Sequence, residues 1–296
     1  MCFDRQNILK ATLFARARAT VGESPLWDQA NDSLWWTDLA RGRLLGTHHA
    51  SRTTHVQELG RCLGGVVLRA GGGLTAALDG GIATIRNGRV RRIADLQLVE
   101  GTERVNDVKC DPHGRLWVGV VGTEAPPAHG SLHLLDAGGP RRVLEGLTFP
   151  NGFDWSPDGA TLYLAESHAR RICRFPFDMR HGQLGAREPF VELDGDDGLP
   201  DGLTVDAKGG VWVAIWGAGE VRRYSPAGTL TAIVSCPVAH TSSCAFGGPD
   251  RHTLYVTSAR EGLDADALRA QPLAGSVFQA GVSIAGLPPR RHADRG

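Results

Sequence analysis

The sequence lacks the short motifs that mark the common classes of enzyme site. Its 11 histidines form no HExxH motif and its six cysteines show no CxxC spacing, which argues against zinc-protease, zinc-finger and disulfide-rich folds. A P-loop, a GxSxG elbow and a Rossmann fingerprint are absent as well. Any chemistry must therefore come from residues that the fold brings together.

The sequence also lacks an excess of either charge and any long apolar run. Its 32 basic and 32 acidic residues give a formal net charge of zero, so neither nucleic acid nor an anionic membrane surface is expected as a partner. No apolar run approaches the ~18–20 residues that span a bilayer, and the opening "MCFDRQNILK" has no apolar core of a signal peptide. We expect a cytoplasmic protein, a monomer or weak homo-oligomer, with free and mostly buried thiols.

A repeated phrase stands out against these absences. "RVNDVKCDPHGRLWVGVVG" (104–122), "FPNGFDWSPDGATLYLAES" (149–167) and "LPDGLTVDAKGGVWVAIWG" (199–217) each hold a polar residue, an apolar run, a turn rich in Pro, Asp or Gly, and a second apolar run. Six such second runs begin at positions 34, 74, 116, 162, 211 and 254. They are spaced by 40, 42, 46, 49 and 43 residues, with no helical periodicity.

A period in the forties made of short strands and turns predicts an all-β fold, a six-bladed β-propeller with four-stranded blades. We expect one propeller domain over residues 1–296, with an N-terminal strand at about 8–20, blades over about 20–286 and a C-terminal tail at 287–296. Residues 8–20 should pair with strands from 275–286 and close the ring. Residues 261–271 should form one or two helical turns.

The polar residue that heads each phrase recurs in one register, ten or eleven residues before the second apolar run. The first strand of a propeller blade is the innermost, so equivalent positions at its start form a ring around the channel. Asp, Glu and Asn together make up 37 of the 296 residues, so six arbitrary positions should hold fewer than one of them. The six ring positions hold four: they are Glu23, Gly64, Asn106, Asn151, Asp201 and Ser243.

These four oxygen-bearing side chains predict a divalent-metal site. Two carboxylates and two amide oxygens are hard ligands that neutralise a divalent cation and leave positions open for water or substrate. Without a cation, Glu23 and Asp201 would repel each other in a confined site. The alternative is that Asn106, Asn151 and Asp201 each cap a local turn. That explanation suits any one residue alone, but the shared register favours the metal site.

The motifs together resemble one known family. "GESPLW" (22–27), "RVNDVKCDPHGRLWVG" (104–119), "FPNGFDWSPDGATLY" (149–163), "PDGLTVDAKGGVWVA" (200–214), "CAFGGPDRHTLYVTSAR" (244–260) and "QPLAGSVF" (271–278) are similar to those of the senescence marker protein 30 (regucalcin)/gluconolactonase family. The resemblance runs from about residue 20 to about residue 286. It implies a six-bladed propeller that hydrolyses sugar lactones with one divalent cation in the channel.

The resemblance also implies roles for single residues. Glu23 in "GESP", Asn151 in "NG" and Asp201 in "PDG" match the metal-binding residues of the family, and Asp201 also matches its proposed general base. Asn106 in "RVND" matches a residue near both metal and substrate.

Two further residues are implied as substrate contacts. Arg104 matches the arginine of the same "RVND" motif. Glu124 matches an acidic residue that binds substrate hydroxyls, although the surrounding "TEAPPAHG" departs from the family pattern.

The sequence thus predicts a metal-dependent hydrolase of carbohydrate metabolism that opens sugar (aldono-)lactones to aldonic acids, like a gluconolactonase. The cation could be calcium, zinc, manganese, magnesium or iron(II), because hard oxygen sites are distinguished by their geometry. Two alternatives remain open at this stage. One is a calcium-binding regulatory propeller, which would not need Arg104. The other is a metal-dependent esterase or phosphotriesterase with a more apolar pocket on the same site.

Overall fold

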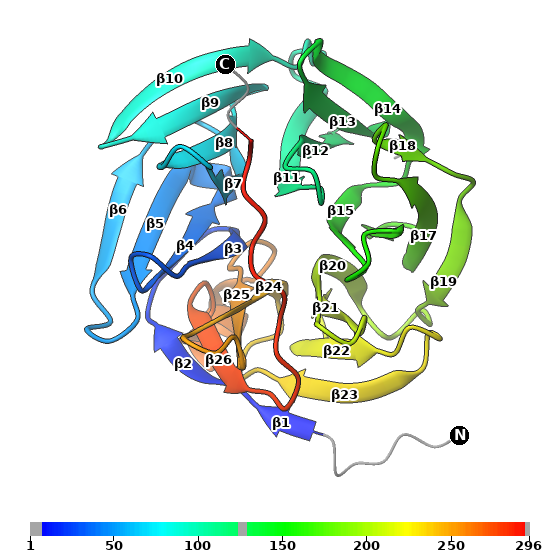
Figure 1. The fold of residues 1–296 in the computed structure, drawn as a ribbon. Coiled ribbons are helices and arrows are strands. Elements are labelled where there is room, and N and C mark those ends of the chain that lie inside the picture. The colour runs from blue at the N-terminus through cyan, green and yellow to red at the C-terminus, as the bar shows by residue number, and fades with distance from the viewer. Residues whose placement is uncertain (1–7, 124–128, 294–296) are drawn as a thin grey trace.

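The chain folds as a ring of six sheets around a central channel (Figure 1). The structure is a computed structural model that describes residues 8–123 and 129–293. Each sheet contains four consecutive blade strands, apart from the replacement noted below for the last blade. The six-bladed all-β propeller predicted from the repeat period is therefore confirmed.

The first three blades follow the chain order from the innermost strand outward. Blade 1 is β3 (Gly22–Asp28), β4 (Ser33–Asp38), β5 (Arg43–His48) and β6 (Thr54–Glu58). Blade 2 is β7 (Leu63–Leu68), β8 (Leu74–Leu78), β9 (Gly81–Arg86) and β10 (Arg89–Asp95). Blade 3 is β11 (Glu103–Cys110), β12 (Leu116–Gly122), β13 (Gly130–Asp136) and β14 (Gly139–Leu147).

The last three blades depart from this pattern: blades 4 and 5 each have a fifth strand, and blade 6 takes its fourth strand from the N-terminal part of the chain. Blade 4 is β15 (Pro150–Trp155), β16 (Thr161–Glu166), β17 (Arg171–Asp178) and β19 (Glu188–Glu192), with the two-residue β18 (Gln183–Leu184) also on β17. Blade 5 is β20 (Leu199–Val205), β21 (Val211–Trp216), β22 (Glu220–Tyr224) and β23 (Leu230–Ser235). Blade 6 is β24 (Thr241–Gly247), β25 (Thr253–Ser258) and β26 (Val277–Gly281), completed by β2 (Thr12–Ala15).

The ring is closed by strands from both ends of the described chain. β2 pairs antiparallel with β26, in the register Thr12↔Gln279, as the sequence predicted. The earlier part of the predicted N-terminal strand behaves differently, because β1 (Ile8–Lys10) pairs in parallel with β23 and adds a fifth strand to blade 5. The expectation that all of 8–20 pairs with the C-terminal strands was therefore wrong for β1.

Turns anchored by aspartate shape two of the blades, blades 3 and 5. In blade 3, Asp111 accepts hydrogen bonds from the backbone N–H groups of His113 and Arg115 and from the indole N–H of Trp117, the last at 3.1 Å. Asp206 repeats the arrangement with the indole of Trp212 at 2.9 Å. Each aspartate thus holds its hairpin turn and the tryptophan at the start of the next strand, which explains why the "D-x-x-G" turns recur at one period.

Apolar side chains pack between neighbouring blades. One cluster joins Trp117 of blade 3 to Phe153 and Trp155 of blade 4, and another joins Trp27 of blade 1 to Tyr255 of blade 6. The five described cysteines are free, and Cys110, Cys173 and Cys244 are buried, as expected. The predicted helical turn is α1 (Ala265–Ala270). No helix of the described part is long and apolar enough to cross a membrane.

The six innermost strands give the channel two different ends. β3, β7, β11, β15, β20 and β24 contact one another around the channel, and their starts gather at one mouth. Across the other mouth runs the C-terminal strap, residues 286–293, which is the red segment that crosses the ring in Figure 1. Its start pairs with Asp206 of blade 5 and its end bonds to Gly114 of blade 3. Because the strap covers this mouth, the channel is accessible from the other end, where the innermost strands start.

Candidate active site

All six innermost strands are bulged near their starts, at the register of the predicted ring. The shifts in strand pairing fall between Glu23 and Leu26, Leu63 and Gly65, Val105 and Asp107, Pro150 and Phe153, Pro200 and Leu203, and Thr241 and Ser243. A bulge inserts a residue that has no partner in the ladder and redirects its side chain. The bulges explain why side chains at these positions turn toward the channel.

Four of the six ring residues line one cavity of about 420 Å³ at the accessible mouth. They are Glu23, Asn106, Asn151 and Asp201, each at most 7% exposed. Gly64 does not line this cavity, and Ser243 lines a smaller cavity beneath the strap. In blade 6 the bulged residue is Ser242, whose hydroxyl bonds to the carbonyl oxygen of Gly22. The ring thus divides into four cavity residues and two that take no part.

The walls of this cavity differ from blade to blade. Blades 2 and 3 contribute the cationic side chains Arg61 and Arg104. Blades 4 and 5 contribute Phe149, His168 and Trp216. On the side of blade 1 the wall is aliphatic, with Val21, Leu39 and Ala40. A polar floor is therefore surrounded by one cationic wall, one aromatic wall and one aliphatic wall.

Among the described residues, no cationic side chain forms an ion pair with either of the two carboxylates on the floor, Glu23 and Asp201. Burial, and then the nearby charge of Glu23, raises the pKa of Asp201 well above its usual range. Burial, and then the charge of Asp107, raises the pKa of Glu23 in the same way. One carboxylate oxygen of Asp201, Oδ1, is buried and has no hydrogen-bond partner within the described chain. Two buried, mutually repelling carboxyl groups with an unsatisfied oxygen are costly unless something else completes them.

Asn151 is oriented by a serine that the sequence analysis did not single out. Its amide nitrogen donates to the hydroxyl of Ser167 at 3.2 Å, and that hydroxyl donates to the carbonyl oxygen of Pro200 at 2.7 Å. Because the nitrogen is held in this way, the amide oxygen is the end that is left for the cavity.

Ser167 could have been found from the repeat. It lies five residues after the start of the second apolar run, at the register of Leu39 in blade 1 and Trp216 in blade 5. All three line the cavity. A second ring, at the ends of the second strands, therefore completes the site.

Arg104 is fixed from two sides. Its guanidinium donates to Oδ1 of Asn106 at 2.7 Å and to the carbonyl oxygen of Val105 at 3.3 Å. It also lies 5.6 Å from the ring centroid of Phe149, which in turn lies 4.6 Å from the imidazole of His168. Phe149 has a φ of 61°, a left-handed conformation that a bulky residue rarely adopts. Strained backbone beside Asn151 thus places an aromatic ring under the guanidinium.

The hydrogen bonds of Asn106 distinguish it from the other floor residues. Its amide oxygen already accepts from Arg104, while its amide nitrogen donates to the carbonyl oxygen of Pro150 at 3.2 Å. A cation on that oxygen would lie close to the guanidinium, which electrostatics disfavours. The geometry therefore favours the substrate role of Asn106 over the metal role. Glu124, the remaining predicted substrate contact, lies outside the described residues.

The floor residues fit a divalent cation. The described chain holds no group of three or more His, Cys, Asp or Glu side chains that could bind a metal, so such a site would rest on two carboxylates and an amide oxygen. Glu23, Asn151 and Asp201 supply that set from blades 1, 4 and 5. A bound cation would satisfy Oδ1 of Asp201 and remove the repulsion from Glu23.

Comparisons with known proteins agree with this geometry. The model of the SMP-30/Gluconolactonase/LRE-like region matches residues 21–260. The pentonolactonase of Haloferax volcanii is 34% identical, over 92% of this chain and 94% of its own, and regucalcin of Oryctolagus cuniculus is 32% identical, over 92% and 94%. Among solved structures, the calcium-binding protein regucalcin of Agrobacterium tumefaciens is 31% identical, with a TM-score of 0.92 over 97% of this chain and 99% of its own.

Proposed function

The chain belongs to the SMP-30/gluconolactonase/LRE-like family and is a lactonase, and we propose that it opens sugar (aldono-)lactones to aldonic acids with one divalent cation. The observation that carries the proposal is the floor of the cavity. Asp201 and Glu23 are buried together with raised pKa values, and Oδ1 of Asp201 has no partner in the described chain. Arg104 lies beside them with a guanidinium that is only partly used by Asn106 and Val105.

Glu23, Asn151 and Asp201 would hold the cation. When bound, it supplies a Lewis acid for the lactone carbonyl, whose oxygen gains negative charge in the transition state. Ser167 keeps the amide oxygen of Asn151 turned toward the cavity. The calcium-binding regucalcin of Agrobacterium tumefaciens supports a divalent ion, and the oxygen-only ligand set does not select one.

Asp201 is the residue proposed to move the proton. Its carboxylate accepts a proton from the water that attacks the carbonyl carbon. It then returns that proton to the ring oxygen as the acyl–oxygen bond breaks, so that the products are one hydroxyl and one carboxyl group. Burial between walls from several blades limits competing water around this carboxylate.

Arg104 and Asn106 are proposed to orient the substrate. A guanidinium presents several N–H donors in a fixed plane and stays charged at any physiological pH. One nitrogen of Arg104 is engaged by Asn106 and Val105, which fixes the plane and leaves the other nitrogens for oxygens of a polyhydroxy ring. Phe149 supports the guanidinium from below.

A substrate panel tests the proposal. Aldonolactones, aryl esters and phosphotriesters should be assayed with and without EDTA, and each chelated sample should be reloaded with single cations. We expect turnover of aldonolactones that EDTA abolishes and that cations restore to different degrees. Preference for aryl esters or phosphotriesters would instead identify the esterase alternative. Cation binding without any hydrolysis would identify the regulatory one.

A further inference from the structure

One aromatic residue on the cavity wall has no role in the chemistry described so far. Trp216 ends β21 of blade 5 and is partly exposed, whereas Trp27, Trp36, Trp117 and Trp155 are at most 1% exposed. It lies directly across the ladder from Leu199, which is two residues before Asp201. The indole is thus placed on the same blade as the proposed base, one step toward the mouth.

The indole is held rigidly from behind. The imidazole of His240 stacks on it with a centroid distance of 4.3 Å and an interplanar angle of 18°. His240 is itself fixed, because its Nδ1 lies 3.0 Å from the carbonyl oxygen of Glu261 and its backbone forms an isolated bridge with Trp216. One face of the indole is therefore covered, and the ring still lines the cavity. Its N–H has no partner in the described part of the chain.

Sugar rings have a chemistry that matches such a surface. Their hydroxyls project outward and need polar partners, while their C–H bonds form an apolar face that packs well on the electron-rich face of an aromatic ring. The floor of the cavity offers polar groups, and Trp216 offers a flat apolar surface beside them. The remaining indole N–H can donate to a ring hydroxyl.

We propose that Trp216, held by His240, is the platform on which the C–H face of a sugar lactone stacks, and that it determines specificity for ring-shaped polyhydroxy substrates. This inference rests on the proposed lactonase function. Trp216 acts on substrate binding and takes no part in proton transfer, so its loss should raise KM and leave kcat nearly unchanged.

The kinetic test compares Trp216→Leu and Trp216→Phe with Trp35→Leu. Trp35 is a matched control, because it is also partly exposed but lies in a separate groove of blade 1 with Ser33 and His48. We expect Trp216→Leu to raise KM for the best aldonolactone about tenfold, from the lost apolar contact, with kcat within about twofold. Trp216→Phe should recover much of the loss, and Trp35→Leu should match the wild type. An unchanged KM in Trp216→Leu would overturn the proposal.

A binding test stays informative if Trp216→Leu fails to fold. 1,5-Anhydro-D-glucitol, a cyclic polyol that keeps the sugar ring but has no ester bond to hydrolyse, is titrated into cation-loaded protein while tryptophan fluorescence is recorded. The wild type and Trp35→Phe should show a saturable change, and Trp216→Phe should show none. A full change in Trp216→Phe would contradict the platform. A wild type that hydrolyses no sugar lactone with any cation would overturn the proposed function instead, and the titration would still test the platform.

Discussion

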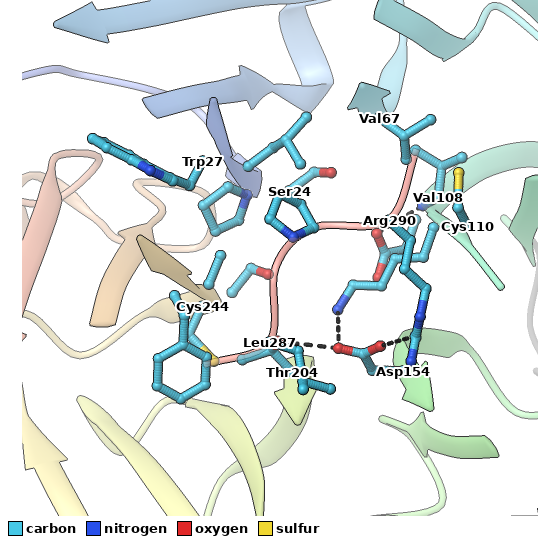
Figure 2. A pocket seen from close by; sticks show the side chains of 18 of the residues that line it. Ser24, Trp27, Val67, Val108, Cys110, Asp154, Thr204, Cys244, Leu287 and Arg290 are labelled. Atoms are coloured by element: carbon cyan, nitrogen blue, oxygen red, sulfur yellow. Dashed lines mark hydrogen bonds and ion pairs between the residues drawn. The ribbon is translucent and has the colours of Figure 1, made fainter. Parts of the chain in front are cut away.

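Two acidic residues in the same channel differ in what surrounds them: Asp154 is mostly buried and has cationic partners, whereas Asp201 is buried and has none within the described residues. Under the strap, Asp154 accepts from Lys109 and Arg290, each at 3.2 Å, and from Thr204 at 3.1 Å (Figure 2). Burial alone would raise the pKa of Asp154, but Lys109 and Arg290 hold it below its usual range. At the accessible mouth, Asp201 has a raised pKa, and its Oδ1 has no hydrogen-bond partner among the residues that the structure describes.

The difference shows which site is structural. The chain supplies every partner that Asp154 needs, including one from the C-terminal strap, 136 residues away. The chain supplies Asp201 with a second carboxylate, Glu23, in place of a cation. Two buried carboxylates that repel each other are tolerated where a bound group from outside the chain neutralises them, which is typical of functional sites. The comparison therefore predicts that Asp154 serves stability and Asp201 serves activity.

The largest expected effect is on turnover in Asp201→Asn. The substitution keeps the size and one oxygen ligand but removes the charge and the proton acceptor. At saturating cation, kcat for the aldonolactone should fall by about 10²–10⁴-fold, the usual cost of losing a general base, while calorimetry should still detect weakened cation binding. If saturating cation restores kcat to near the wild-type value, Asp201 is a cation ligand only, and the claim that it acts as the general base is contradicted.

The opposite experiment breaks the structural site. Asp154→Ala leaves Lys109 and Arg290 without their partner in a mostly buried place, and should lower the free energy of unfolding by about 3 kcal/mol. Denaturant unfolding measures this effect, and kcat of the folded fraction should not change. Glu58→Ala is the control, because its ion pair with Arg43 is exposed and should contribute less than about 1 kcal/mol. Loss of kcat with unchanged stability in Asp154→Ala would reverse the assignment.

Substitution of Arg104 separates the residues that bind the substrate from those that bind the cation. An arginine cannot bind a cation, so Arg104→Ala should lower kcat/KM by about 10- to 100-fold, the range for a hydrogen bond to a charged group, and leave cation affinity nearly intact. Arg104→Lys retains the charge without the planar fork and should recover only part of the loss. Unchanged kinetics with a lowered melting temperature would mean that Arg104 only stabilises the fold.

Ser167 and Asn151 should give the smallest effect on chemistry. Asn151→Ala removes an oxygen ligand, and Ser167→Ala releases the amide that it orients, so both should weaken cation affinity. For Ser167→Ala the expected loss is about 10- to 100-fold. Excess cation should restore much of the activity of both variants. Ser131→Ala, a buried serine paired with His133 in blade 3, is the control. Activity of Ser167→Ala that no cation concentration recovers would argue for a direct role in the reaction.

Much of the architecture could be predicted because it depends on local signals. Turn residues and alternating apolar runs recur at each blade. Their period places Glu23, Asn151 and Asp201 at equivalent positions of their blades. The bulges that turn these side chains inward have no comparable signal. Gly64 shows the limit: it shares the register but packs against the backbone of blade 3, where an added Cβ would lie 3.1 Å from the backbone nitrogen of Asn106. Gly64→Ala is therefore not a neutral control for the ring.

The strap and the aromatic wall could not be predicted for a different reason. "LPPRRH" (287–292) contains no strand or helix pattern, and its place depends on an ion pair between Arg290 and a blade that is distant in sequence. Trp216 is one of seven tryptophans in the chain, and only the packing of blade 5 shows that it borders the cavity. Contacts of this kind, between segments distant in sequence, can be identified only from the three-dimensional arrangement of the blades.

Calorimetric cation binding to metal-stripped protein tests the central claim, that a divalent cation completes Glu23 and Asp201. Their pKa values are raised, so at pH 6 the metal-free pair still holds a proton that ordinary carboxyl groups would have lost, and a cation must displace it. Titrations in two buffers of different ionisation enthalpy should therefore show one cation per chain with release of protons, and recovery of lactonase activity at the same stoichiometry. Full turnover by protein shown to be metal-free by elemental analysis would contradict the account.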